Sequence, residues 1–497
     1  MKVRISVFLF LLLQAVFSLS DAVSPTCLAQ KRVAASAKNV GLEERIRRVE
    51  NGLLPAVIVK GEPAAAMNIA DRLQFYKTPG VSVAVINNGK IEWARGYGVL
   101  EKGGTAPVTA ETLFQAASIS KPVAAMGAMR LVQDKKLNLD EDVNKKLGSW
   151  KIPENEFTKE QKVTLRGLLS HSNSLTVHGF GGYSSDTKPP TLVQILDGTP
   201  PANSKPIRVD GAPYKTWRYA GGGYVVMQML VENVTREPYP AFMEKAVLEK
   251  IGMKRSTYEQ PLPRELWDSA ARGHKADGEK VKGNWNTYPE MTAAGLWTTP
   301  SDLARFAIEI QKSIAGKSNK VLSAKTTNEM LAPQIGGWGL GPELTGQDGS
   351  KRFGHGGSNA GFQCLMVAYF GTGQGAVVMT NSDQGGGVAG EVMRSIAREY
   401  GWLDYLSKER VVVPLEPKIY GDYAGKYQLT PEATLTIVNE DGKLSLQGAG
   451  QLFPASETEF FLKTVAAEIV FVRDAMGKVN GLILRQGKRE MSAKRID

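Results

Sequence analysis

Strand-like apolar runs at two distant places in the chain predict a single β-sheet. Residues 81–86 and 91–94 flank an Asn-Asn-Gly turn at 87–89, which is the pattern of a β-hairpin. Further strand-like runs occur at residues 362–370 and 376–380. Because mainly helix and loop patterns separate the two groups, we expect both ends of this region to contribute strands to one sheet, with helices inserted between them.

Helix signals occupy the stretch between these runs. The mostly apolar run at residues 123–132 directly follows a proline, which a helix accepts in its opening turn. Residues 224–232 form an apolar helical face behind a glycine-rich loop. Thr299 as N-cap, Pro300 in the first turn and Asp302 as capping partner predict the start of another helix. Helices and sheet together predict an α+β fold.

The C-terminal part of the chain has a different pattern. Residues 403–418 read as a linker, since prolines in the stretch 411–417 remove backbone donors and stiffen the chain. From 419 to 497 short alternating runs such as 434–438 and 443–446 are separated by turn signals such as Asp-Gly. This alternation predicts a small antiparallel β-barrel domain.

The first residues have the pattern of a secretory signal. A basic start precedes a largely apolar run at residues 5–19, which is too short for a convincing membrane anchor. Small-residue patterns place cleavage after Ala22 or after Ala29, and we take residues 1–22 as the signal peptide. The sequence therefore predicts an exported protein, periplasmic or secreted.

Composition and charge exclude one class of partner. The 497 residues are 42% hydrophobic and carry a formal net charge of +11, which is typical of an ordinary globular protein of two or more domains. The densest basic group, at residues 45–48, follows two glutamates as on a solvated helix face. No basic patch with interleaved aromatic residues occurs, so no nucleic acid partner is expected. The net charge favours a weak attraction to acidic cell-wall polymer, and the sequence does not determine the oligomeric state.

Cysteines and histidines give no sign of a metal or a cofactor. Cys27 and Cys364 are too few for a disulfide framework, and Cys364 in a strand-like run reads as a small buried residue. The four histidines show no His-Glu-x-x-His spacing. A Gly-x-Ser-x-Gly motif is also missing from the sequence, which disfavours an α/β-hydrolase. We expect neither a metal nor another cofactor.

The most informative motif is Ser-Ile-Ser-Lys at residues 118–121. Residues three apart on a helix are neighbours, so Lys121 can lie beside the Ser118 hydroxyl and help to remove its proton. Roughly two Ser-x-x-Lys matches are expected by chance in a chain of this length, and the second, at residues 185–188, runs into Pro189, which disfavours helical geometry before it. The first match is therefore the candidate nucleophile site.

Five blocks of the chain, in order, resemble the serine β-lactamase and penicillin-binding-protein superfamily. The resemblance is to its branch with class C β-lactamases, DD-peptidases, D-aminopeptidases and related esterases. Residues 118–121 match the first motif, 219–221 (Tyr-Ala-Gly) the Tyr-x-Asn motif, and 355–357 (His-Gly-Gly) the Lys-Thr-Gly or His-x-Gly motif. Residues 168–172 and 294–299 are similar to two supporting segments of the family.

The resemblance covers residues 45–400 and carries expectations about architecture. It implies a β-lactamase/DD-peptidase-like antiparallel sheet flanked by helices, with a mainly helical insertion, which we place at residues 45–402. The C-terminal barrel at 419–497 resembles a lipocalin-like module found on some family members. A lid, an oligomer contact and an appendage that adds only stability are the alternatives for its role.

The resemblance also implies roles for individual residues. Ser118 would attack a carbonyl carbon while Lys121 and Tyr219 share general-base and general-acid work, and His355 would complete the site. Backbone N–H groups of Ser118 and Ser358 would form the oxyanion hole. A covalent acyl-enzyme would then be hydrolysed by water.

Departures from the family pattern narrow the expected substrate. Gly221 stands where the family has an asparagine that helps to bind an acylamino group, and His355 in place of lysine is mostly neutral near pH 7. Gly356 and Gly357 leave room for the substrate against the strand. His171 is expected to be a structural histidine hydrogen-bonded near the site.

We therefore predict an exported serine hydrolase that cleaves an amide or ester bond of a small peptide-like or ester substrate through an acyl-enzyme on Ser118. A peptidase or an esterase is favoured over a true β-lactamase. The alternative from another class is a catalytically idle protein that binds peptide or cell-wall fragments, which the loss of the asparagine suggests. Retention of Ser118, Lys121, Tyr219 and His355 together favours the enzyme, because a pure binder needs no amine beside its serine.

Overall fold

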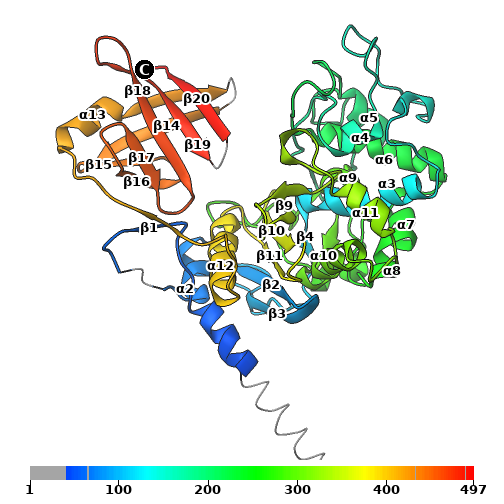
Figure 1. Cartoon of the computed structure of the whole chain (residues 1–497), viewed down its shortest axis with the longest axis horizontal. Helices are drawn as coiled ribbons and strands as arrows, with labels where there is room; N and C mark the ends of the chain where they lie inside the picture. Colours follow the sequence, from blue (N-terminus) through cyan, green and yellow to red (C-terminus); the bar gives the residue numbers. More distant parts are fainter. Residues whose placement is uncertain (1–40, 64–65, 431–432, 487–488) are drawn as a thin grey trace, which may run out of the picture. The chain divides into compact units, whose positions relative to one another are not determined.

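The computed structural model describes residues 41–63, 66–430, 433–486 and 489–497 (Figure 1). The predicted signal peptide and its cleavage sites lie outside these residues. The chain divides into two units, Met1–Arg48 and Val49–Asp497, and the elements below belong to the second. No helix in the described part of the chain has both the length and the apolar character needed to cross a membrane.

A six-stranded antiparallel sheet joins the two groups of strands that the sequence predicted. Its order is β3-β2-β11-β10-β9-β8, so the early hairpin pairs through β2 with the late strand β11 (Figure 1). The turn of the hairpin has positive φ at Asn88 and Gly89, as the Asn-Gly signal requires. The strands are β2 (Gly80–Asn87), β3 (Lys90–Gly98), β8 (Glu343–Thr345), β9 (Arg352–Asn359), β10 (Phe362–Tyr369) and β11 (Gly375–Thr380).

Helices pack against this sheet and fill the region between its two groups of strands. The apolar run after the candidate nucleophile is α3 (Ser120–Gln133), and its residues from Ser120 to Met129 are all buried. The helix behind the glycine-rich loop, α6 (Gly221–Thr235), begins three residues earlier than the predicted apolar face. The central strands pack against α10 (Pro300–Ile314) and α12 (Gly385–Glu399). The predicted α+β fold is confirmed.

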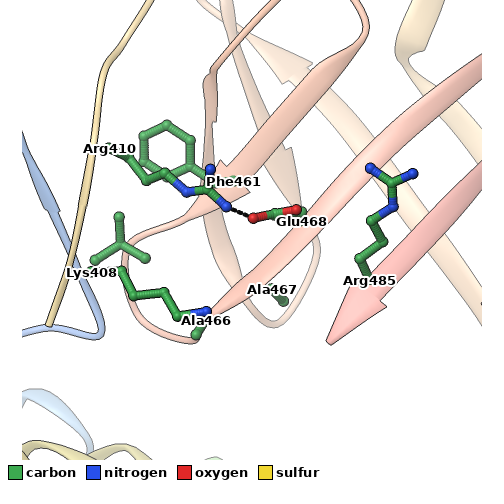
Figure 2. Close-up of a pocket in the computed structure, with 8 residues that line it drawn as sticks. Lys408, Arg410, Phe461, Ala466, Ala467, Glu468 and Arg485 are labelled. Carbon is green, nitrogen blue, oxygen red and sulfur yellow. Dashed lines mark ion pairs between the residues drawn. The ribbon is translucent and has the colours of Figure 1, made fainter. Parts of the chain in front are cut away.

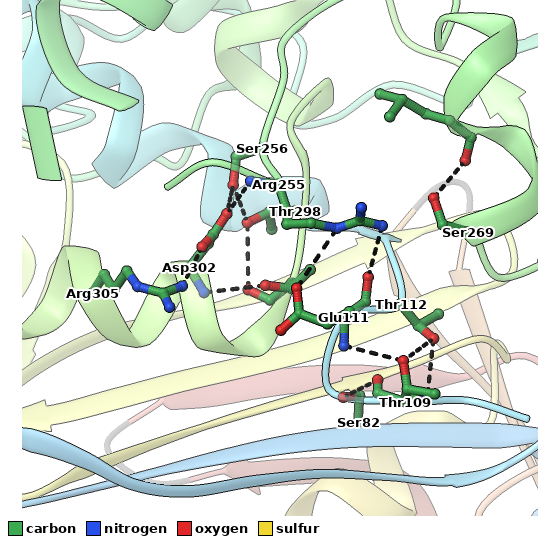
Figure 3. A network of polar contacts seen from close by, with 12 residues as sticks. Ser82, Thr109, Glu111, Thr112, Arg255, Ser256, Ser269, Thr298, Asp302 and Arg305 are labelled. Carbon is green, nitrogen blue, oxygen red and sulfur yellow. Dashed lines mark hydrogen bonds and ion pairs between the residues drawn. The ribbon is translucent and has the colours of Figure 1, made fainter. Parts of the chain in front are cut away.

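The start of α10 forms a polar network that differs from the predicted cap. Thr299 accepts a hydrogen bond from Asp302 N as expected, but the Asp302 carboxylate accepts from Arg255 N and Ser256 Oγ, each at 2.8 Å, and pairs with Arg305 (Figure 3). The same Ser256 hydroxyl lies 2.7 Å from the hydroxyl of Thr298. Through these bonds the network holds the short strand β7 (Trp297–Thr298) in place.

The strand held by this network pairs with the strand that directly precedes the candidate nucleophile in the chain. β7 pairs with β4 (Phe114–Gln115), and Ala116 N donates to Leu296 O at 2.8 Å, directly before the 3₁₀ turn η1 (Ala117–Ile119). Two elements that are about 180 residues apart therefore fix the approach of the chain to Ser118. A buried, hydrogen-bonded ladder is a rigid platform for a reactive side chain.

The C-terminal part is a closed barrel of eight antiparallel strands, which confirms the predicted barrel. The strands run in chain order, from β13 (Gly425–Thr430) to β20 (Arg489–Arg495). The interior is a packed core that contains Tyr427 and Phe471. Between β13 and β20 the barrel strands are β14 (Ala433–Glu440), β15 (Lys443–Leu446), β16 (Gly450–Pro454), β17 (Glu459–Leu462), β18 (Ala467–Arg473) and β19 (Val479–Gln486).

The stretch that the sequence predicted as a linker contains a short strand. β12 (Lys408–Arg410) pairs in parallel with β1 (Val57–Val59). Arg410 also forms an ion pair with Glu468 of β18, beside a small pocket that Lys408 and Arg485 line as well (Figure 2). With a ladder and an ion pair, this stretch is not a free connection, although its prolines do precede the barrel.

Candidate active site

The nucleophile candidate lies on a strained turn at the start of a buried helix. Ala117 has a φ of +49°, a left-handed conformation that is uncommon for alanine and is often found next to reactive residues. Ser118 itself is half-buried, whereas Ala117 and Ile119 have no exposed surface. Helix α3 begins at Ser120, two residues after Ser118, as the proline in its opening turn indicated. In contrast, residues 185–188 of the second Ser-x-x-Lys match lie in a turn.

Lys121 has the position of a proton acceptor for Ser118. Its Nζ lies 3.0 Å from Ser118 Oγ and donates to the backbone carbonyl of Ala293 at 2.8 Å. The side chain is 2% exposed, and no carboxylate of the described residues perturbs its amine. Burial without a negative partner lowers the pKa of Lys121 to about 7. A large share of this lysine is therefore a free amine at neutral pH.

Tyr219 lies across the site from the helix that carries these two residues. Its ring centre is 4.9 Å from Lys121 Nζ, and its hydroxyl lies 3.4 Å from His355 Nε2. Burial raises the pKa of Tyr219 well above its ordinary value, and a hydrogen bond with Ser118 opposes part of that rise. The phenol therefore keeps its proton at neutral pH, which suits a donor more than an acceptor.

His355 stands on β9 with its ring buried. Its Nδ1 is close to the carbonyl oxygen of Gly356, and a carbonyl only accepts, so Nδ1 carries the proton. The other nitrogen, Nε2, is left to accept from the Tyr219 hydroxyl. Burial, and next the charge of Lys121, lower the pKa of His355 to about 3. The ring is therefore neutral at pH 7 and offers no positive charge to a substrate.

Two glycines that follow His355 on β9, Gly356 and Gly357, have different amounts of free space around them. A Cβ on Gly357 would lie 2.3 Å from the carbonyl oxygen of Ala116, so only glycine lets this strand approach the nucleophile turn so closely. A Cβ on Gly356 would have 3.9 Å to its nearest neighbour, and the residue is exposed. The next residue, Ser358, is exposed and accepts a hydrogen bond from Gln363 Nε2 at 2.7 Å. Its place in the oxyanion hole stays a prediction.

His171 is hydrogen-bonded to the backbone on both sides of Tyr219, in agreement with the expectation of a structural histidine near the site. Its carbonyl oxygen accepts from Arg218 N at 3.0 Å and its Nδ1 accepts from Ala220 N at 3.2 Å. Its ring stacks on the Tyr219 ring with 4.3 Å between the centres. The sequence indicated a structural role for His171, but not that Tyr219 and its backbone neighbours are what it contacts.

Two tryptophans, also unforeseen, complete an aromatic wall around the site. Trp338 lies with its ring centre 5.6 Å from that of His355 and 5.9 Å from that of Tyr219. Trp217 lies 5.1 Å from Trp338. Such rings exclude water from a site and strengthen the electrostatic interactions inside it.

Other reactive groups play no part in this arrangement. Cys364 is buried, its thiol donates to the Gln115 carbonyl, and burial raises its pKa to about 12, so it is not a nucleophile. Among the described residues no three His, Cys, Asp or Glu side chains are grouped as a metal site would need. What the structure does bring together is a serine, a partly neutral lysine, a protonated tyrosine and a neutral histidine. Such a set can form and break a covalent ester at the serine.

Family comparison covers nearly the whole described chain. A family model described as Beta-lactamase matches residues 66–398, and a model described as a domain of unknown function (DUF3471) matches residues 409–496. The first match spans the six-stranded sheet, helices α3, α6 and α10, and every predicted site residue. The second spans the barrel.

Individual relatives agree with these matches. Penicillin-binding protein 4* of Bacillus subtilis is 22% identical over 446 residues, which are 85% of this chain and 95% of the relative. Penicillin-binding protein 4 of Amycolatopsis lactamdurans is 26% identical over 343 residues, which are 65% of this chain and 85% of the relative.

Solved structures share the fold. The octameric penicillin-binding protein homologue from Pyrococcus abyssi matches with a TM-score of 0.59 and 20% identity, over 85% of this chain and 98% of the other. The D-amino acid amidase from Ochrobactrum anthropi matches with a TM-score of 0.55 and 22% identity, over 67% and 98%.

Proposed function

Because the chain belongs to the beta-lactamase family, we propose that it is a serine hydrolase that cleaves an amide or ester bond through an acyl-enzyme on Ser118. The observation that carries this proposal is the 3.0 Å distance between Lys121 Nζ and Ser118 Oγ, with the amine buried and its pKa lowered to about 7. An amine in that state can take the proton of the serine hydroxyl as it attacks.

The chemistry proceeds in two half-reactions. In the first, Ser118 Oγ bonds to the substrate's carbonyl carbon while its proton passes to Lys121, and the carbonyl oxygen takes up negative charge. Backbone N–H groups of Ser118 and Ser358 are our candidates to stabilise that charge. The bond to the leaving group then breaks as the leaving atom receives a proton from Tyr219, which regains one from Lys121. In the second half-reaction water replaces the serine and releases the acid.

A peptidase or esterase is a better match for this site than a β-lactamase. Gly221 supplies no amide side chain to hold an acylamino group. His355 is neutral and Lys121 is already bonded to Ser118 and Ala293, so neither offers a fixed cation for a carboxylate on the substrate. We further propose that the protein acts outside the cytoplasm, periplasmic or secreted, because its N-terminal sequence has the pattern of an export signal.

Intact-mass spectrometry of the purified protein tests the proposed function. After exposure to a fluorophosphonate we expect a single adduct that peptide mapping places on Ser118 and that the Ser118→Ala variant lacks. A lasting adduct with a labelled penicillin as well would identify a penicillin-binding peptidase. If folded protein gives no adduct with either reagent, the site is not an activated nucleophile and the peptide-binding alternative, which the missing asparagine favours, replaces the enzyme.

A second expectation concerns His171. The His171→Ala variant should lower kcat for an activated ester about tenfold while changing KM by less than about twofold, because Tyr219 loses its stacking and backbone partners but the substrate's own contacts remain. The measurement is steady-state hydrolysis of p-nitrophenyl acetate.

His171→Asn is the matched control for this expectation. Its side-chain oxygen can accept from Ala220 N as the ring nitrogen does, so part of kcat should return. Two outcomes would show that His171 has no role in positioning Tyr219. In one, kcat falls only in proportion to the loss of folded protein; in the other, it falls equally in both variants.

A further inference from the structure

We propose that the pocket between residues 176–181 and 203–208 binds an uncharged, apolar part of the substrate, so that the natural substrate is an ester or amide of an apolar group rather than an acylamino acid. This inference rests on the proposed function of Ser118. It assigns the specificity of the site to Phe180 and to the absence of a side chain at Gly221.

The first support is what occupies the space beside Gly221. A Cβ at this position would lie 3.0 Å from Phe180 Cε2 and 3.0 Å from the carbonyl oxygen of His178. A longer side chain such as asparagine would have to displace the phenyl ring. The ring of Phe180 therefore occupies the space that a polar side chain at position 221 would need. The site has an apolar surface at the position where the Tyr-x-Asn motif of the family has an amide side chain.

The segment that carries Phe180 is fastened to the start of α6. Gly221 N donates to His178 O at 3.0 Å and Gly222 N donates to Val177 O at 3.0 Å. A Cβ on Gly222 would also meet the carbonyl oxygen of Thr176 at 2.6 Å. This close contact between two backbone segments fixes the position of Phe180 relative to Tyr219. The apolar surface of Phe180 is therefore preorganised before the substrate binds.

The pocket that Phe180 lines is large enough for a substituent. Its volume is about 460 Å³, within the range of small-molecule sites. Apolar lining comes from Val177, Phe180 and Pro206, together with two glycines.

The polar side chains of the lining are mostly bonded to the protein. The Thr176 hydroxyl donates to Pro206 O and accepts from Arg208 N, at 2.9 and 2.8 Å. The Arg208 guanidinium donates to Ile207 O at 2.8 Å and pairs with Asp197. Among the described lining residues, the Ser204 hydroxyl is buried and has no hydrogen-bond partner, so it can bond to an uncharged polar atom of the ligand. Polar groups that are already paired do not favour a charged ligand.

The pocket is close to the nucleophile. Phe180 touches the position of Gly221, which follows Tyr219 by two residues, and the His178 ring lies with its centre 4.9 Å from that of Tyr219. The Tyr219 ring in turn lies with its centre 4.9 Å from Lys121 Nζ, which is 3.0 Å from Ser118 Oγ. A series of contacts therefore connects the pocket lining, through Gly221, Tyr219 and Lys121, with the nucleophile.

The charges around the nucleophile agree with an uncharged substrate. His355 is neutral, and the nearby Arg218 pairs with Asp210 and donates to Ser174 O. Lys205, on the pocket lining, is exposed to solvent. A cation in contact with water attracts a carboxylate only weakly, so Lys205 does not make the pocket an acid-binding site.

Two ester series test the inference. In one, the acyl chain grows from acetyl to octanoyl on p-nitrophenol; in the other, the alcohol grows from methanol to octanol on an acetyl group. We expect kcat/KM to rise at least about tenfold along one of the series, since each methylene that enters an apolar pocket adds binding energy. Both Phe180→Ala and Gly221→Asn should reduce that ratio between long and short esters about tenfold.

A control variant accompanies these. Phe75→Ala removes an exposed phenyl ring from α2 (Ile69–Phe75), outside the pocket lining. It should leave the ratio between long and short esters unchanged. A flat ratio in both series, with acetate still hydrolysed, would overturn the inference while leaving the proposed function intact.

A binding measurement decides the case even without turnover. In the Ser118→Ala protein, octanamide should bind at least about tenfold more tightly than octanoate by calorimetry, and Phe180→Ala added to that protein should weaken octanamide binding by a similar factor. Equal binding of both ligands would overturn the preference for an uncharged group. Tighter binding of octanoate that Lys205→Ala removes would identify a site for a charged group instead. No hydrolysis of any ester together with no fluorophosphonate adduct would reject the proposed function separately.

Discussion

Replacing Ser118 by alanine should lower kcat for every ester and amide substrate on the order of 10⁶-fold, which leaves only the residual rate that substrate binding and oxyanion stabilisation supply. The oxygen of this serine is the atom that bonds to the substrate in the proposed mechanism. Ser118 is half-buried in the 3₁₀ turn directly before α3, and Lys121 Nζ is within hydrogen-bond distance of its hydroxyl oxygen. Without the hydroxyl there is no covalent intermediate, and the remaining groups can only bind the substrate.

The chain offers a matched control for this result in its second Ser-x-x-Lys match. Ser185 lies in a turn, where its hydroxyl donates to the Gly283 carbonyl at 2.8 Å, and Lys188 is exposed. Ser185→Ala should therefore hydrolyse p-nitrophenyl acetate as the native protein does. Activity that survives in Ser118→Ala, or that is lost in Ser185→Ala, would show that the nucleophile has been assigned to the wrong serine.

Replacing Lys121 by methionine should lower kcat by about 10²- to 10⁴-fold, which is the usual contribution of a general base. Methionine fills a similar volume without an amine, so the proton of Ser118 loses its acceptor. In the native protein kcat/KM should rise as the pH increases through about 7, because the amine becomes free above its lowered pKa. The measurement is a pH–rate profile of ester hydrolysis, and the inflection near pH 7 should be missing from the variant.

Lys121→Arg separates the two roles that a lysine can have here. Arginine keeps the positive charge but does not release its proton. If the free amine is the base, as the buried position of Lys121 favours, the arginine variant should be as inactive as the methionine variant. If instead the charge serves to acidify Tyr219, arginine should retain activity and the native rate should fall as the pH rises above 7.

The stability of the methionine variant is a check that the loss of activity is not a loss of folding. The unfolded chain holds this amine protonated up to its ordinary pKa of 10.5, whereas the folded protein releases the proton at about 7. Native stability therefore falls as the pH decreases from 10.5 to 7, since the unfolded state binds the proton more tightly. Lys121→Met removes that penalty, so its free energy of unfolding at pH 7 should equal or exceed that of the native protein.

The elements that the sequence predicted well are those set by neighbouring residues. The Asn-Gly turn defined the hairpin, and Thr299 and Pro300 defined the start of α10, because turn and cap geometry depend on a few adjacent residues. The prediction failed in part at Asp302, whose carboxylate turns to Arg255 and Ser256, 47 and 46 residues away. A partner so distant leaves no mark in the local pattern.

The candidate site divides in the same way. By itself the sequence determined which residue types are present and their order: a serine and a lysine three positions apart, a tyrosine, and a histidine before two glycines. Only the tertiary structure decided their chemical state. Ala293, 172 residues from Lys121, receives its hydrogen bond, while Phe180 fills the space beside Gly221 and His171 holds the backbone around Tyr219. The physical reason is that desolvation and packing depend on what surrounds a group in space, and those neighbours come from every part of the chain.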